Sequence, residues 1–265
     1  MPTDFQGLSD FRLETPVYTS GPLKTARDFL WLLRAELFLL REAWYWYLVH
    51  SSFVSVSYFL FLWLVVGRQG GVDVTHLVVG SMVTGLSLGG MLSLGQHLGV
   101  LKERHAFDYY AALPISKAAF VAAVTTRGTL LALPSNVVVA VLSTLFFGVS
   151  LPPVTIPILL LSAYAMAGFG AVIGFWSPSA QVASLVTQIL QTVIIFFAPI
   201  YYSPEVLPRF LRITSYLWPT TYAATAVRAA ISGDPAVYRS IAVLAGFCLM
   251  SLVLVPMKLD WRGKK

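Results

Sequence analysis

The sequence has little charge for its length. Asp, Glu, Lys and Arg make up 11% of the 265 residues, whereas 57% are hydrophobic. A soluble globular domain carries about 25% charged and about 45–50% apolar residues. No soluble core of this size hides so much apolar surface, but a bilayer does, because a helix of about 20 apolar residues crosses its hydrocarbon layer. The composition therefore predicts an all-α, polytopic membrane protein.

Three further absences limit the cofactors and metal ions that this chain could bind. The single cysteine, Cys248, excludes an intrachain disulfide and a cysteine zinc cluster. No GxxxxGK[ST] loop occurs, so we do not expect the chain to bind ATP by that route. No carboxylate or cysteine completes a metal-ligand set around the four histidines, which are His50, His76, His97 and His105. We therefore predict no catalytic residue, no metal site and no cofactor on this chain.

Acidic residues are also missing from the interiors of the apolar runs. Proton- or sodium-coupled carriers usually keep carboxylates at mid-membrane, so this absence argues against a secondary transporter. The net charge of +6 does not indicate nucleic acid, because the basic residues flank apolar runs and form no continuous patch with stacking aromatics. Energy for any transport is therefore expected to come from another protein.

The apolar runs divide the chain into four parts. Residues 1–22 form a polar extension, 23–46 an amphipathic helix, 47–256 a six-span domain and 257–265 a cytoplasmic tail. The six predicted spans cover residues 47–66, 74–98, 118–147, 158–176, 182–197 and 238–256. Glycines four residues apart predict close helix packing at Gly85 and Gly89, at Gly95 and Gly99, and at Gly170 and Gly174.

The segment 23–46 combines an apolar stripe with a basic face. The apolar stripe consists of Leu30, Leu33, Leu37, Leu40 and Trp44, and the arginines that recur every seven residues are Arg27, Arg34 and Arg41. This pattern predicts a helix that lies in the membrane interface. The alternative is that the segment is simply the cytoplasmic start of the first span.

Residues 198–234 are apolar but broken by prolines. Four prolines divide the region into pieces too short to cross a bilayer: Pro199, Pro204, Pro208 and Pro219. We expect short external re-entrant helices before the last span, since irregular backbone in a membrane must be covered by protein or water. Lysine and arginine near the span ends place both termini and residues 99–117 in the cytoplasm, and residues 198–234 outside.

Two segments carry a resemblance to a known family. The charged loop after the second span reads LKERHAFDYYAALPISK, and residues 197–233 read FAPIYYSPEVLPRFLRITSYLWPTTYAATAVRAAISG. With the amphipathic helix and six spans, they resemble the permease subunit of type-2 ABC exporters (ABC-2 type transporters), which export drugs, lipids and cell-surface polysaccharides. The resemblance implies a cell-membrane permease that forms a homodimer and docks on two ABC ATPase subunits. Those ATPases, and not this chain, would bind ATP and Mg.

The resemblance also implies that the charged loop couples the permease to the ATPase. The candidate coupling residues are Glu103, Arg104, His105, Phe107, Asp108 and Tyr109. Aromatic side chains in a loop of mixed charge are costly to leave in water and are enriched at protein interfaces. The alternative is a solvated loop that only follows the excess of basic residues on the cytoplasmic side.

The translocation path would lie between two copies, lined by the second and fifth spans. The candidate lining residues are Thr187, Gln188, Gln191, Phe196 and Tyr201. For the glutamines, hydrogen bonding between helices is an equal alternative. The substrate moved outward would be amphipathic or lipid-linked.

Two other functions stay open at this point. A membrane-embedded transferase would need a cluster of polar residues at one membrane surface, which the sequence does not show. A structural or assembly protein of the membrane, without a transport role, is compatible with acid-free spans and an aromatic loop. Co-purification of an ATPase subunit would exclude that last alternative.

Overall fold

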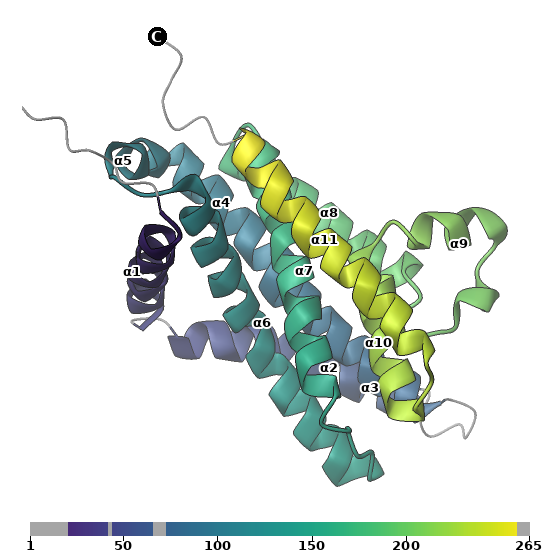
Figure 1. The fold of residues 1–265 in the computed structure, drawn as a ribbon. Coiled ribbons are helices and arrows are strands. Elements are labelled where there is room, and N and C mark those ends of the chain that lie inside the picture. The colour runs from purple at the N-terminus through teal and green to yellow at the C-terminus, as the bar shows by residue number, and fades with distance from the viewer. Residues whose placement is uncertain (1–20, 42–43, 66–72, 259–265) are drawn as a thin grey trace, which may run out of the picture.

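The computed structural model describes residues 21–41, 44–65 and 73–258, and these are helical apart from short connections (Figure 1). The described residues contain no strand, so the predicted all-α fold is confirmed for them. The predicted polar extension at 1–22 and the predicted tail at 257–265 lie almost entirely outside the described residues.

Short connections join the helices along the chain. In order they are α1 (Pro22–Arg41), α2 (Trp44–Val65), α3 (Val74–Leu86), the π-helix η3 (Ser87–Leu92), α4 (Ser93–Glu103), α5 (Ala106–Ala112), α6 (Lys117–Phe147), α7 (Thr155–Trp176), α8 (Ala180–Phe197), the 3-10 helix η4 (Pro204–Val206), α9 (Arg209–Ser215), α10 (Pro219–Ser232) and α11 (Ala236–Lys258). In the described chain, six helical segments are long and apolar enough to cross a membrane: α2, α3 to α4, α6, α7, α8 and α11. They match the six predicted spans, so the chain is a multi-pass membrane protein.

The second span forms the centre of the bundle, and we call residues 74–103, from α3 through η3 to α4, the spine. Within its most apolar stretch, 89% of the residues are buried inside the chain. A Cβ atom on Gly89 would lie 2.4 Å from the Cα of Ala132 in α6, and one on Gly170 of α7 would lie 2.4 Å from the carbonyl oxygen of Met91. The predicted close packing at these glycines is therefore confirmed, and it lets helices approach the spine closely from two sides.

Helix α1 packs against α6. Its buried residues are four apart and include two acids: Asp28, Leu32, Glu36 and Leu40. Of the predicted leucine stripe, Leu40 is buried, Leu30 and Leu37 are exposed, and Trp44 begins α2, whereas α1 ends at Arg41. Glu36 turns inward because α6 presents the buried Arg127 to it. A location of α1 in the membrane interface stays a prediction.

The region between α8 and α11 contains short helices, as expected from its prolines. Pro219 begins α10, where a proline fits the first turn, and Gly233 ends it in a left-handed conformation with φ of 72°. Helix α10 packs against α7 and α11. A partial dip of this region into the membrane stays a prediction.

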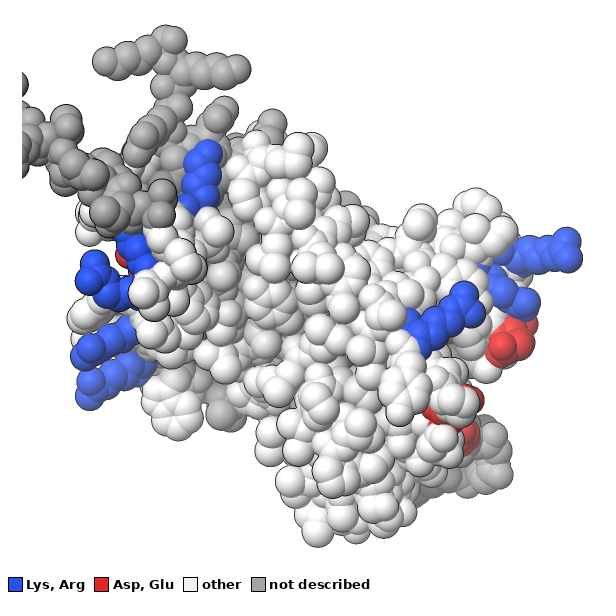
Figure 2. Space-filling view, in the orientation of Figure 1, with Lys and Arg blue, Asp and Glu red and all other residues white. Residues whose placement is uncertain are grey.

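Charged side chains gather toward the two ends of the molecule on the face shown in Figure 2. The end that carries α1 and α5 shows Lys and Arg, and the surface between the two ends is largely uncharged. An uncharged belt of this kind suits the hydrocarbon layer of a bilayer. Which end faces the cytoplasm stays a prediction.

Candidate functional site

Helix α5 turns the chain back between α4 and α6. After α4 ends at Glu103, His105 takes a left-handed φ of 54° and reverses the chain before α5 begins. A left-handed residue other than glycine costs about 1–2 kcal/mol, so packing elsewhere must hold the turn in place. Lys102 contributes, because its Nζ donates to the carbonyl oxygen of Ser177 at 2.8 Å and ties the end of α4 to the connection between α7 and α8.

The inner face of α5 is aromatic and packed against the bundle. Phe107 stacks on Phe175 with 5.2 Å between ring centroids, and Tyr110 lies 4.7 Å from the Phe120 ring. Burial raises the pKa of the Tyr110 hydroxyl, and the nearby carboxylate of Glu36 raises it further. Phe107, a predicted coupling residue, therefore packs against other helices of this chain. The sequence did not show this, because spacing alone does not say which side of a short helix faces inward.

The outer face of α5 and the preceding turn collect the other candidate coupling residues, and we call this surface the docking face. Its exposed members are Glu103, Arg104, His105, Asp108 and Tyr109. Tyr109 is 66% exposed, and His105 Nδ1 lies 3.5 Å from Asp108 Oδ2. The docking face thus combines charges of both signs with one projecting aromatic ring, a combination suited to a protein contact.

A buried ion pair lies behind the docking face, and sequence reasoning missed it. Arg127 Nε of α6 is 3.2 Å from Glu36 Oε2 of α1, and both side chains are 4% exposed. His97 Nε2 of the spine approaches the same carboxylate oxygen at 3.7 Å. The acidic group that the spans lack therefore reaches them from α1. In the part of the chain that is described, no group of three or more His, Cys, Asp and Glu could hold a metal ion.

The inward face of α8 is joined to the spine by polar contacts. Ser87 Oγ donates to Gln191 Oε1, and the hydroxyls of Thr84 and Tyr201 lie 2.8 Å apart. Thr187 is fully buried, and its hydroxyl donates to a carbonyl oxygen of its own helix. Gln191 of α8 and Tyr201, which follows α8, thus contact the spine in this conformation, and Thr187 is buried with its hydroxyl bonded inside its own helix.

The outward face of α8 carries the remaining two path candidates. Gln188, Thr192 and Phe196 are four residues apart and exposed, and we call them the outward stripe. Gln188 Nε2 donates to Ser184 Oγ at 2.8 Å. Sequence reasoning named Gln188 and Phe196 but omitted Thr192, although the spacing of four residues places it between them on the same face.

A groove between α2 and the spine borders α8, and we call it the α2 groove. It has a volume of about 420 Å³ and is lined by Trp46, Tyr47, His50, Leu88, Leu92, Ser93 and Gln96. Gln96 Nε2 lies 3.4 Å from Ser184 Oγ of α8, so the α2 groove and the outward stripe are linked through one serine. Sequence reasoning missed this groove, because the aromatic residues at the start of α2 meet residues of the spine that are distant along the chain.

The comparison with known families covers all of these features. The family model for the ABC-2 type transporter matches residues 27–232, which run from within α1 to the end of α10. No curated protein matches the chain. Membrane domains of this family are transport components that work with an ABC ATPase. The match includes most of the chain, and the chain belongs to the ABC-2 type transporter family as a permease.

Proposed function

We propose that this permease exports an amphipathic or lipid-linked substrate across the cell membrane, through a path between two copies of the chain. Two ABC ATPase subunits bind the docking faces of the pair and supply ATP hydrolysis, so ATP and Mg belong to those subunits. Both termini then lie in the cytoplasm. The outward stripe of α8 carries this proposal.

A polar stripe on an exposed face of a spanning helix is costly in lipid. Gln188 and Thr192 are exposed in the single chain, while their helix crosses the membrane. The Thr192 hydroxyl donates to the carbonyl oxygen of Gln188 at 3.0 Å, so the cost falls mainly on the Gln188 amide, which has further groups to donate and accept beyond its bond to Ser184. Such an amide favours a bundle interior or a water-filled cavity, because the hydrocarbon layer offers no hydrogen-bond partners. A second copy that faces α8 provides such a cavity, and the stripe then lines the path between the two.

The α2 groove supports an amphipathic substrate class. Trp46 and Tyr47 offer flat apolar surfaces, while His50, Ser93 and Gln96 offer hydrogen-bonding groups. A ligand with both an apolar part and an uncharged polar part matches that mixture. Ser184 contacts Gln96 of the groove and Gln188 of the outward stripe, which supports a groove beside the proposed path.

Cysteine cross-linking tests the arrangement of two copies. Thr192→Cys, in a Cys248→Ser background that removes the single native cysteine, is expected to form a cross-linked dimer in membranes. Leu249→Cys is the matched control, because Leu249 is 65% exposed on α11 and faces lipid in the proposed dimer. A cross-link at Leu249 with none at Thr192 would overturn the proposed path.

The docking face is tested separately by ATPase binding. Tyr109→Ala removes an exposed aromatic anchor, and loss of such an anchor costs about 2 kcal/mol, or roughly a factor of 30 in affinity. We expect weaker capture of the ATPase with an unchanged melting temperature of the permease. Phe107→Ala is the contrasting variant, because it removes buried packing and lowers the melting temperature. Undiminished ATPase capture by Tyr109→Ala would remove the docking face from the proposal.

A further inference from the structure

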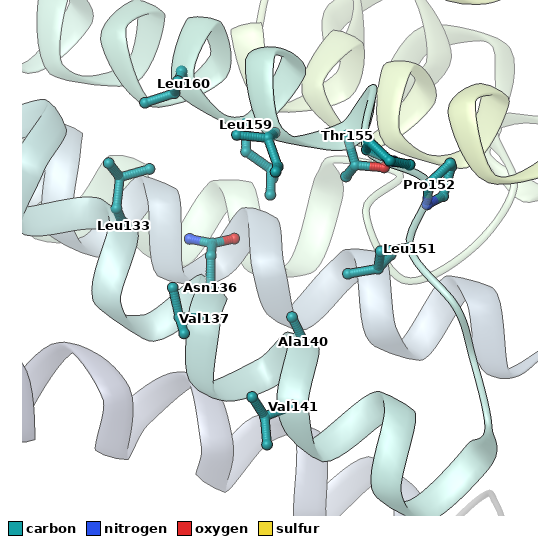
Figure 3. A pocket seen from close by; sticks show the side chains of 12 residues that line it. Leu133, Asn136, Val137, Ala140, Val141, Leu151, Pro152, Thr155, Leu159 and Leu160 are labelled. Atoms are coloured by element: carbon teal, nitrogen blue, oxygen red, sulfur yellow. The ribbon is translucent and has the colours of Figure 1, made fainter.

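Another groove lies between α6 and α7, at the end of the bundle remote from α5 (Figure 3). Helix α6 starts beside α5, and the groove is lined by its second half, from Leu133 onward, and by the start of α7. Its volume is about 490 Å³. Val137 and Ile156 at this groove are each 63% exposed, so an apolar surface surrounds it on the side that faces the membrane.

Two polar side chains break the apolar lining. Asn136 is 3% exposed and Thr155 is 1% exposed. Asn136 uses its Nδ2 to donate to the carbonyl oxygen of Ala132 at 2.9 Å, but its Oδ1 has no hydrogen-bond partner among the described residues. The Thr155 hydroxyl has none there either. Figure 3 shows Asn136 pointing from α6 into the space beside Leu159 of α7.

Unpartnered polar atoms inside a membrane protein favour a ligand that can form hydrogen bonds with them. A buried polar atom without a hydrogen bond costs about 1–3 kcal/mol, and the hydrocarbon layer holds no water to supply one. A hydroxyl group suits either atom, because it can donate to Asn136 Oδ1 or accept from Thr155 Oγ1. The residues that line the groove include no charged side chain, so a phosphate or ammonium headgroup would lie there unpaired.

We propose that this groove binds an uncharged membrane lipid with a free hydroxyl, of which diacylglycerol is the simplest example. Thr155 is the first residue of α7, so the polar end of the groove lies near the membrane boundary, where lipid hydroxyls reside. The apolar lining formed by Leu133, Leu159 and Leu160 then holds part of one acyl chain. The site is separate from the outward stripe, because its lining comes from α6, α7 and the connection between them, and no residue of α8 is part of it.

Photolabelling of the full chain in lipid nanodiscs tests this site. The probe is a diacylglycerol with a diazirine in one acyl chain, and the comparison probe is the same molecule with its hydroxyl acetylated. Mass spectrometry is expected to locate the label within residues 133–160. The hydroxyl probe should label about tenfold more than the acetylated one, the fold-change that one hydrogen bond provides.

Matched variants separate this site from general lipid contact. Val137→Trp fills the groove and should abolish labelling, whereas Val253→Trp, at a residue 61% exposed on α11, should leave it unchanged. Asn136→Leu keeps the side-chain size and should reduce the hydroxyl probe to the level of the acetylated probe. If that variant does not fold, Thr155→Val tests the same hydroxyl contact.

Three outcomes would overturn the proposal. One is equal labelling by the two probes, which marks ordinary lipid contact. Another is labelling that survives Val137→Trp at full strength. The third is a cross-link from a benzophenone placed at Val137 to a second copy of the chain, which would make the groove a protein interface.

Discussion

The second and fifth spans are similarly apolar, yet they occupy opposite environments. In the most apolar stretch of each span, 89% of the residues of the spine are buried inside the chain, but only 22% of those of α8. Small residues let other helices surround the spine, whereas α8 packs through one face and leaves the outward stripe exposed. A polar residue on a surrounded helix has a structural role, and a polar residue on an exposed face indicates a path or a partner. In the proposed function α8 therefore carries the stripe that faces the path, while the spine holds the bundle together and lines one side of the α2 groove.

The largest expected effect comes from the buried ion pair beside the spine. Arg127→Leu leaves Glu36 buried without its partner, and removal of one member of a buried pair costs about 3–5 kcal/mol. Thermal unfolding of the purified permease in detergent measures this loss. The double variant Glu36→Leu, Arg127→Leu removes both charges and should recover most of the melting temperature, because apolar replacement of a buried pair is often neutral. Equal melting temperatures for the single and double variants would contradict the pairing.

Gly89→Ala tests how tightly the spine is enclosed. The added Cβ would meet the backbone of Ala132 at 2.4 Å, and backbone has little room to shift. Overpacking of this kind costs about 1–3 kcal/mol. Gly246→Ala in α11 is the matched control, since a Cβ there meets nothing within 4 Å and alanine favours a helix by about 1 kcal/mol. A change of melting temperature in the same direction for both variants would show that the spine at Gly89 is no more tightly enclosed than α11 at Gly246.

Two glutamines on one helix sharpen the contrast between structural and functional roles. Gln191→Leu removes the acceptor of the buried Ser87 hydroxyl and should destabilise the fold by about 1–2 kcal/mol. Gln188→Leu, on the outward stripe, should change the free energy of unfolding by no more than about 0.5 kcal/mol and should lower transport in reconstituted vesicles with the ATPase. A loss of stability for Gln188→Leu equal to that of Gln191→Leu would mean that both are packing residues.

Much of the fold could be predicted from the sequence, because the signals are local. Apolar runs bounded by charges or prolines gave six spans close to the observed helices. Glycines four apart marked places of close approach, such as Gly89 against Ala132. The residues of the docking face were named from the family resemblance, and their docking role stays a prediction. They are exposed because they lie on the outer face of α5, in the turn before it and at the end of α4.

The remainder depends on partners that are distant along the chain. Glu36 pairs with Arg127, and nothing in the periodicity of α1 shows that a basic side chain faces it. Phe107 was expected among the coupling residues, but it packs on the Phe120 and Phe175 rings, which come from other helices.

The smallest expected effect lies at the end of the spine farthest from the docking face, where Asp73 caps α3. Its Oδ1 accepts from the Thr75 amide at 2.9 Å, and its Oδ2 lies 3.0 Å from His76 Nδ1. Burial alone would raise the pKa of Asp73, but these hydrogen bonds outweigh it and hold the pKa below the usual 3.8. The charged form is therefore favoured by folding, so its contribution is present above about pH 4 and is lost as the pH falls through the lowered pKa.

Asp73→Ala should cost about 1 kcal/mol at neutral pH, whereas Asp73→Asn keeps a good cap and should lose only the part that depends on charge. The difference in melting temperature between wild type and Asp73→Asn should narrow from about pH 7 to about pH 3. A difference that stays constant over this range would show that the cap acts without its charge.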